Sequence, residues 1–104
     1  MSEQAQTESR SQQYSLPSAQ CMNHSVKLAI AEDRPIMLDY YTDSLDGKVI
    51  IGVREDGEEK LLVKSAEEYT SAISKIYKVG EEYIILTENS LYIVSSKVES
   101  KKVG

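Results

Sequence analysis

Cys21 and His24 are the first residues whose types could do chemistry, since they are the only cysteine and the only histidine of the chain. A thiol beside an imidazole pairs a nucleophile with its base. Such catalysis also needs a rigid frame and a group that stabilises the oxyanion. The surrounding segment is polar and predicts a flexible chain, so we expect no catalytic site. One Cys and one His also exclude a disulfide scaffold and a metal cage of those ligands.

Carboxylates are the next candidates, because five of them lie within 15 residues: Glu32, Asp33, Asp39, Asp43 and Asp46. Oxygen ligands in a loop could bind a hard cation. Their spacing is not that of an EF-hand loop, and Asp43 and Asp46 lie in a cluster typical of turns. We therefore predict neither a metal site nor a cofactor.

Tyrosine supplies every aromatic residue of this chain, seven in all. Tyr40 and Tyr41 are consecutive, so in a strand one of them must face away from the core. Tyrosine is enriched at protein interfaces, although a half-buried ring with a solvated hydroxyl is the structural alternative. We take Tyr40, Tyr41, Asp39, Asp43 and Tyr92 as candidate binding residues.

The elements that must position these side chains are mostly strands. Period-two alternation, or β-branched and Tyr-rich composition, marks each of them. The segments are 26–30, 35–41, 48–54, 60–64, 82–87 and 91–95. Turns at 43–47, at 56–57 and at 88–90 are short, and short connections imply antiparallel neighbours. Gly52 lies inside a strand segment and indicates a bend.

Residues 66–78 leave two interpretations open. Ser65 and Glu68 have the spacing of a capping box, and apolar residues follow at helical spacing. Many residues after them are mediocre helix formers. We favour one helical turn at 66–69 followed by a strand at 72–79, and keep a helix at 66–78 as the alternative.

The chain divides into three parts. Residues 1–25 include six Ser and five Gln, and such a segment buries too little apolar area to offset its ordering entropy. We predict a flexible arm at 1–25, a single compact β domain at 26–98 and a frayed tail at 99–104. The fold class is all-β, a small antiparallel roll or barrel of six or seven short strands after a disordered N-terminal arm. The alternative is an α+β fold with one helix at 66–78.

Charge and composition narrow the class of partner. The 104 residues carry a net charge of −5, which makes nucleic acid an unlikely partner, because domains that bind it are usually basic. No apolar stretch approaches the roughly 18 residues of a spanning helix, and the first residues do not resemble a signal peptide. We expect an intracellular protein of a reducing compartment, cytoplasm or nucleus, with no membrane partner.

Three hypotheses of function follow. The first is a non-catalytic protein–protein interaction module that binds through a strand edge or a Tyr-bearing face. The second is a structural component of a larger assembly, such as a virus particle, in which the arm orders on neighbouring subunits. In that case the protein would be encoded by the virus. The third is an acidic inhibitor of a basic protein that handles nucleic acid. The partner is then another protein or a second copy of the chain.

Overall fold

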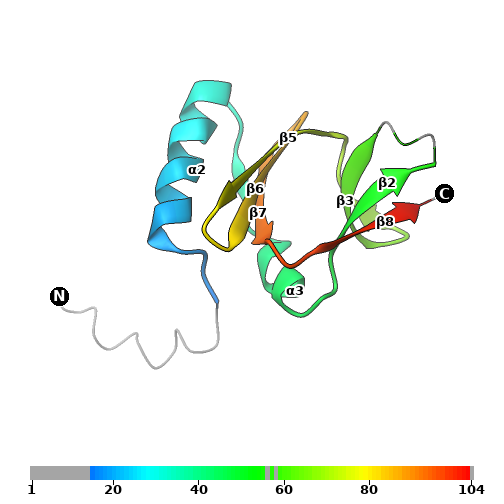
Figure 1. Cartoon of the computed structure of the whole chain (residues 1–104). Helices are drawn as coiled ribbons and strands as arrows, with labels where there is room; N and C mark the ends of the chain where they lie inside the picture. The colour runs from blue at the N-terminus through cyan, green and yellow to red at the C-terminus, as the bar shows by residue number, and fades with distance from the viewer. Residues whose placement is uncertain (1–14, 56, 58, 104) are drawn as a thin grey trace.

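The computed structural model describes residues 15–55, 57 and 59–103. Two helices and eight strands follow one another in this part of the chain (Figure 1). In order they are α2 (Ala19–Glu32), β1 (Ile36–Met37), α3 (Tyr41–Leu45), β2 (Ile50–Arg54), β3 (Lys60–Ser65), β4 (Glu68–Tyr69), β5 (Ile73–Val79), β6 (Glu82–Thr87), β7 (Leu91–Ser95) and β8 (Glu99–Val103).

The strands form two four-stranded sheets. Sheet A has the order β1-β7-β6-β5, and sheet B has the order β4-β3-β2-β8. Neighbouring strands are antiparallel except for β1 with β7 and β2 with β8, which are parallel. Sheet A therefore ends at β1 and β5, and sheet B ends at β4 and β8. The sheets are open, so the predicted closed barrel is wrong, whereas the sheet-rich domain of short strands is confirmed.

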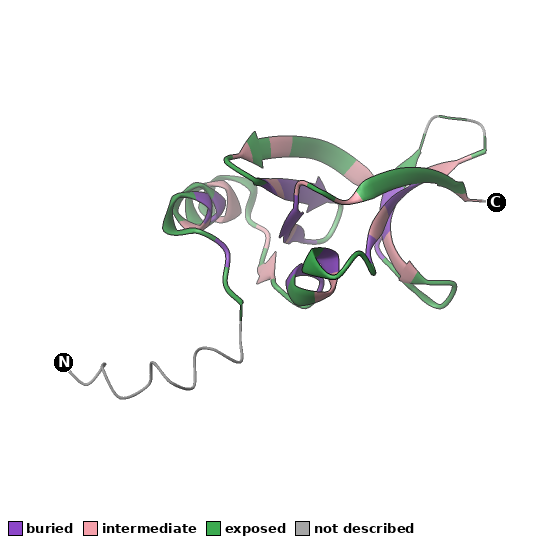
Figure 2. Cartoon of the chain, turned by 60° about the horizontal axis from the view of Figure 1, so that its bottom comes forward, coloured by how far each residue is buried: buried purple, intermediate pink, exposed green. Residues whose placement is uncertain are grey.

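Helix α2, sheet A and sheet B are stacked, and β6 shows how the core is divided between them. Ile84 and Leu86 belong to the core cluster that includes Cys21 of α2. Ile85, which points to the opposite face, belongs to the cluster that includes Leu62 of sheet B. Both faces of β6 are covered, and this explains its continuous apolar sequence. Figure 2 shows the buried strands in the middle of the molecule and the more exposed strands β5 and β8 outside them.

Gly52 allows a close approach on the outer face of sheet B. A Cβ atom at this position would lie 3.0 Å from Cγ2 of Val63 and 3.2 Å from the methyl groups of Val103. These two valines belong to β3 and β8, on either side of β2. The absence of a side chain at Gly52 thus leaves room for the side chains of Val63 and Val103 to approach β2 closely.

Helix α2 replaces part of the predicted arm and the predicted strand at 26–30. Ser18 caps it, because its Oγ accepts a hydrogen bond from the Cys21 N–H at 3.1 Å. Cys21 and Ser25 are fully buried, one helical turn apart. The apparent alternation at 26–30 came from the two faces of a helix, because Val26 and Ile30 are exposed. Residues 1–14 of the predicted arm lie outside the described part of the chain.

Helix α3 replaces the end of the strand predicted at 35–41. Only Ile36–Met37 form a strand, β1. Tyr40 occupies the N-cap position of α3 without a side-chain capping hydrogen bond, and Tyr41 is the first helical residue. Both side chains are buried. Tyr41 joins the core beneath α2, and Tyr40 joins the core between the sheets. An alternating strand would have left one of them exposed.

The segments at 66–79 and 99–104 also differ in part from expectation. The helix at 66–78 is wrong, and the strand at 72–79 is confirmed as β5. The predicted helical turn at 66–69 is a tight turn leading into β4, in which Ser65 Oγ accepts the Glu67 N–H at 3.2 Å. Residues Glu99–Val103 of the predicted frayed tail form strand β8, and residue 104 lies outside the described part of the chain. The backbone of β8 pairs with all five residues of β2, and this pairing orders a polar sequence.

Candidate functional site

Four of the five predicted site residues lie around the contact of Tyr40 with Lys64. The rings of Tyr40 and Tyr92 meet edge to face, with centroids 5.2 Å apart. Lys64 Nζ lies 4.7 Å from the centre of the Tyr40 ring and 3.3 Å from Oδ2 of Asp43. The negative charge of Asp39 contributes to the raised pKa of Tyr92, after burial of the ring. These four residues are therefore near one another in the structure, whereas Tyr41 is not among them.

This cluster is built mainly for packing between elements. Lys64 also pairs with Glu68 at 3.5 Å, so it links β3 with α3 and β4. Burial by itself lowers the pKa of Lys64, but the hydrogen bond with Asp43 and the nearby carboxylates outweigh this effect and raise it. Burial of Tyr40, helped by nearby acidic groups, raises its pKa to about 12. Tyr40 is 3% exposed, so its ring offers almost no surface to a partner.

Tyr41 belongs to a second polar cluster, centred on the carboxylate of Glu82. Tyr41 donates its hydroxyl to Oε2 of Glu82 at 2.8 Å. The backbone N–H and the hydroxyl of Ser18 donate to Oε1 of the same carboxylate at 3.1 and 3.0 Å. Glu82 is only 8% exposed. Since Ser18 is the N-cap of α2, this carboxylate ties the start of the helix to the start of β6.

The surroundings of Cys21, which include the Glu82 carboxylate, determine the reactivity of its thiol. Burial, followed by the negative charge of Glu82, raises the pKa of the Cys21 thiol to about 11. A buried thiol with this pKa stays protonated at neutral pH and is a poor nucleophile. His24 lies on the exposed side of the same helix. Cys21 and His24 are thus three residues apart on α2, but the thiol is buried and the imidazole is exposed.

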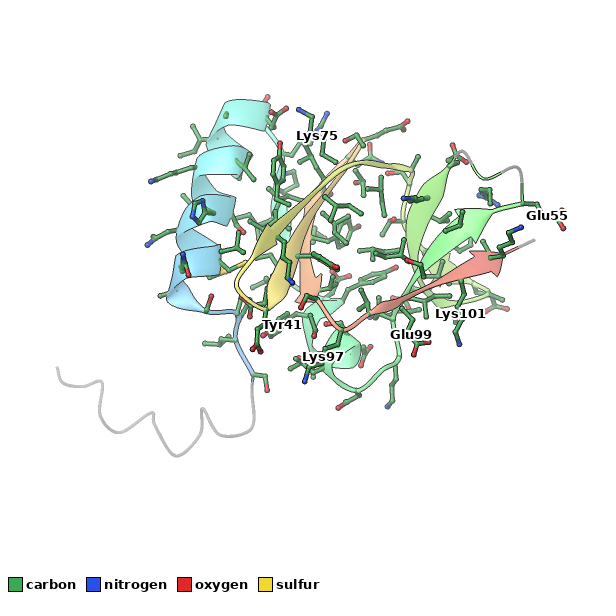
Figure 3. All side chains as sticks on the ribbon, viewed as in Figure 1. Tyr41, Glu55, Lys75, Lys97, Glu99 and Lys101 are labelled. Atoms are coloured by element: carbon green, nitrogen blue, oxygen red, sulfur yellow. The ribbon has the colours of Figure 1, made fainter. Side chains whose placement is uncertain are left out.

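A groove between α2 and β5, here called the α2–β5 groove, combines apolar walls with polar groups. Its volume is about 310 Å³, and its walls are His24, Leu28, Tyr77, Lys78, Val79 and Ile84. The strand that borders it, β5, is the outermost strand of sheet A. Figure 3 shows Lys75 projecting from this part of the molecule, on the side of α2. Sequence reasoning missed this groove because it treated α2 as an arm and a strand.

A larger groove lies on the outer face of sheet B. Its volume is about 600 Å³, and Arg54, Leu61, Val63, Tyr69 and Val103 are among its walls. Tyr69 is 55% exposed, so it is the tyrosine that presents its ring to solvent here. Arg54 pairs with Glu59 at 3.4 Å across the β2–β3 turn. A Tyr-bearing face therefore exists, but its tyrosine is not among the five predicted residues.

Residues 15–55, 57 and 59–103 hold neither a candidate metal site nor a candidate membrane span. No group of three or more Cys, His, Asp or Glu side chains is placed to hold a metal ion there. No helix in this part of the chain has the length and apolar character needed to span a membrane. Comparison of the chain with models of protein families, with curated proteins and with solved structures gave no match.

Proposed function

We propose that this chain is a non-catalytic protein–protein interaction module that binds its partner through the free edge of β5. The observation that carries the proposal is the position of β5. It is the longest strand described, and it ends sheet A. Within the described residues its backbone pairs with β6 alone. An extended segment of another protein could continue the sheet there by main-chain hydrogen bonds.

The α2–β5 groove supports the choice of this edge. In recognition by strand addition, main-chain hydrogen bonds supply affinity, and pockets for alternate side chains supply specificity. β5 contributes Tyr77 and Val79 to the groove, and α2 contributes Leu28. The edge strand and the pocket for a side chain are therefore adjacent.

The other edge strands are less suited to the addition of a partner strand. β1 and β4 have two residues each. β8 has five residues, of which Glu99, Ser100, Lys101 and Lys102 are exposed, so its side chains are mostly polar. The sheet B groove lies on a face rather than at an edge, so binding there would use side chains without strand addition. We therefore place the partner at β5.

The acidic-inhibitor hypothesis remains a second candidate, because several carboxylates of the described residues are exposed and form no ion pair there, namely Glu32, Asp33, Asp46, Glu55, Glu67, Glu81 and Glu88. Other carboxylates are engaged within the chain. Asp43 and Glu68 pair with Lys64, and Glu59 pairs with Arg54. Glu82 is buried. An inhibitor that imitates nucleic acid needs carboxylates that are free to meet a basic partner.

The proposal is tested by capturing partners from extract of the source cell on the immobilised full chain, followed by mass spectrometry. Ile76→Ser removes an apolar side chain of β5 that is 38% exposed. Tyr69→Ser on sheet B is the matched control. We expect Ile76→Ser to lose the captured protein and Tyr69→Ser to retain it, with both variants folded by urea denaturation. The reverse result would place binding on sheet B and contradict the proposal.

A further inference from the structure

We infer that the partner segment of β5 carries two carboxylates three residues apart, with apolar residues between them, and adds to sheet A as a fifth strand. This inference rests on the proposed function and specifies the chemistry of the partner. It follows from the order of side chains along β5 and from the surroundings of its two faces.

The register of β5 with β6 assigns each β5 side chain to a face. Lys75 and Tyr77 pair with Leu86 and Ile84, which face α2. Paired residues share a face of the sheet. Lys75 and Tyr77 therefore lie on the α2 face.

The intervening residues of β5 lie on the opposite face. Ile76 pairs with Ile85, and Lys78 pairs with Tyr83. Ile85 and Tyr83 belong to the core between the two sheets. By this register the two lysines are on opposite faces of β5, although Lys78 also borders the α2–β5 groove, and one apolar side chain on each face lies between them.

A strand added to the edge of β5 would lie opposite these four side chains, which alternate between the two faces of the sheet. Directly opposed residues of neighbouring strands have Cβ atoms about 4.5–5.5 Å apart, and pairs of opposite charge stabilise the sheet. A carboxylate is therefore the matching side chain opposite Lys75 and opposite Lys78. An apolar side chain is the match opposite Ile76 and opposite Tyr77. The side chain opposite Tyr77 lies on the α2 face, where the α2–β5 groove can receive it. The spacing of the carboxylates is the same whether the added strand is parallel or antiparallel.

The two lysines are available for such pairs. Both side chains are exposed, and neither forms an ion pair with any described residue. Lysines on edge strands also discourage aggregation between sheets. Lysines that only prevent aggregation would give no preference for carboxylates at a defined spacing. A binding experiment therefore distinguishes protection against aggregation from recognition of an acidic segment.

The experiment measures binding of the full chain to fluorescein-labelled synthetic peptides by fluorescence polarisation. The probe has the core Glu-Val-Leu-Glu between Ser-Thr flanks. Control peptides have the cores Gln-Val-Leu-Gln, Glu-Ser-Ser-Glu and Glu-Val-Glu-Leu, which remove the charge, the apolar pair and the spacing in turn. Amide signals of β5, followed by NMR, locate the bound peptide.

Variants of the chain give a second readout. We expect Lys75→Gln and Lys78→Gln each to weaken binding of the Glu-Val-Leu-Glu probe about 1.5- to 5-fold, as for a cross-strand charge pair. The double variant Lys75→Glu/Lys78→Glu should bind a Lys-Val-Leu-Lys peptide instead. Lys101→Gln/Lys102→Gln on the edge strand β8 is the matched control and should leave binding unchanged.

Main-chain pairing is tested by methylation of peptide nitrogens. Alternate N–H groups of an added strand face β5, so N-methylation of one alternate set should abolish binding and methylation of the other set should be tolerated.

Two results separate the inference from the proposed function. Equal binding of the Gln-Val-Leu-Gln and Glu-Val-Leu-Glu peptides, with shifts at β5, overturns the acidic partner and leaves the strand edge in use. Absence of shifts at β5 with every peptide overturns the use of this edge itself.

Discussion

Glu82 shows at the scale of a single residue how a buried charge is stabilised in this molecule. A carboxylate that leaves water needs hydrogen bonds or a counter-charge. Glu82 receives hydrogen bonds from Tyr41 and from two groups of Ser18. Burial by itself raises its pKa, but these hydrogen bonds outweigh burial and lower the pKa below the ordinary 4.5. The carboxylate is therefore ionised in the folded chain at neutral pH.

We expect Glu82→Gln to destabilise the fold by about 1.5–3 kcal/mol, the contribution of hydrogen bonds to a charged group. The amide retains one acceptor oxygen, but its NH2 group cannot accept from Tyr41 or Ser18. Urea denaturation at neutral pH measures the loss. Glu81→Gln, at the exposed neighbouring position, is the control and should change the midpoint little. Equal midpoints for the native chain and Glu82→Gln would contradict a stabilising role.

The pH dependence gives a second prediction for the same residue. A carboxyl group whose pKa is lower in the folded chain stabilises the fold above its unfolded pKa, and this stabilisation is lost as the pH falls through the folded value. We expect the difference in stability between the native chain and Glu82→Gln to shrink as the pH falls below 4.5. Urea midpoints over an acidic pH series measure it. A difference that stays constant at every pH would rule out ionised Glu82 as its source.

At the scale of the elements, β2 depends on the absence of a side chain at Gly52. Replacement by Ala would place a Cβ 3.0 Å from Val63 and 3.2 Å from Val103. We expect Gly52→Ala to cost about 1–3 kcal/mol by overpacking. The double variant Gly52→Ala/Val63→Ala makes room, so its loss should be smaller than the sum of the two single losses. Urea denaturation of the four proteins measures the cycle, and additive losses would contradict the contact.

The strands that the sequence predicts best are those buried on both sides. β6 and β7 match the segments 82–87 and 91–95 because β-branched residues and short turns identify them locally. Helix α2 was missed because its buried face includes the small residues Cys21 and Ser25, which give weak apolar periodicity. Ser18, after Leu16 and Pro17, was the available signal for the helix start.

The candidate site was also predicted only in part, because the sequence reports local features and the arrangement of the site depends on tertiary contacts. Asp39 and Asp43 lie near Tyr40 along the chain, because Asp39 precedes it and Asp43 belongs to α3, whose N-cap is Tyr40. The contact of Tyr40 with Tyr92 of β7 depends on tertiary structure, and nothing in the sequence indicated it. Burial of Tyr40 and Tyr41 depended on α3, which was predicted as strand and turn. The α2–β5 groove needed both α2 and the edge position of β5, and neither is a local property of the chain.

At the scale of the whole molecule, α2 is an integral part of the domain rather than an arm. Deletion of residues 1–24 removes Ser18, which donates to Glu82, and Cys21, which is fully buried. We expect this deletion to destabilise the domain by several kcal/mol, as for the loss of buried apolar contacts and of hydrogen bonds to a charge.

Thermal unfolding followed by circular dichroism measures the effect of the deletion. Deletion of residues 1–14 is the control, since it keeps every contact described here. An unfolding temperature of the 1–24 deletion equal to that of the full chain would show that α2 does not support the sheets. Mass measurement in solution on the same samples distinguishes a monomeric adaptor from a self-assembling component.

The sequence by itself determined that this is a small acidic domain rich in short strands, because alternation, β-branched residues and tight turns act over a few neighbouring positions. Only the tertiary structure decided which strands end each sheet, that two pairs of strands are parallel, and that 19–32 is a helix. These features depend on contacts between distant segments, such as Ser18 with Glu82 and Ile50 with Glu99. The free edge of β5 and the groove beside it, on which the proposed function rests, arise from those distant contacts.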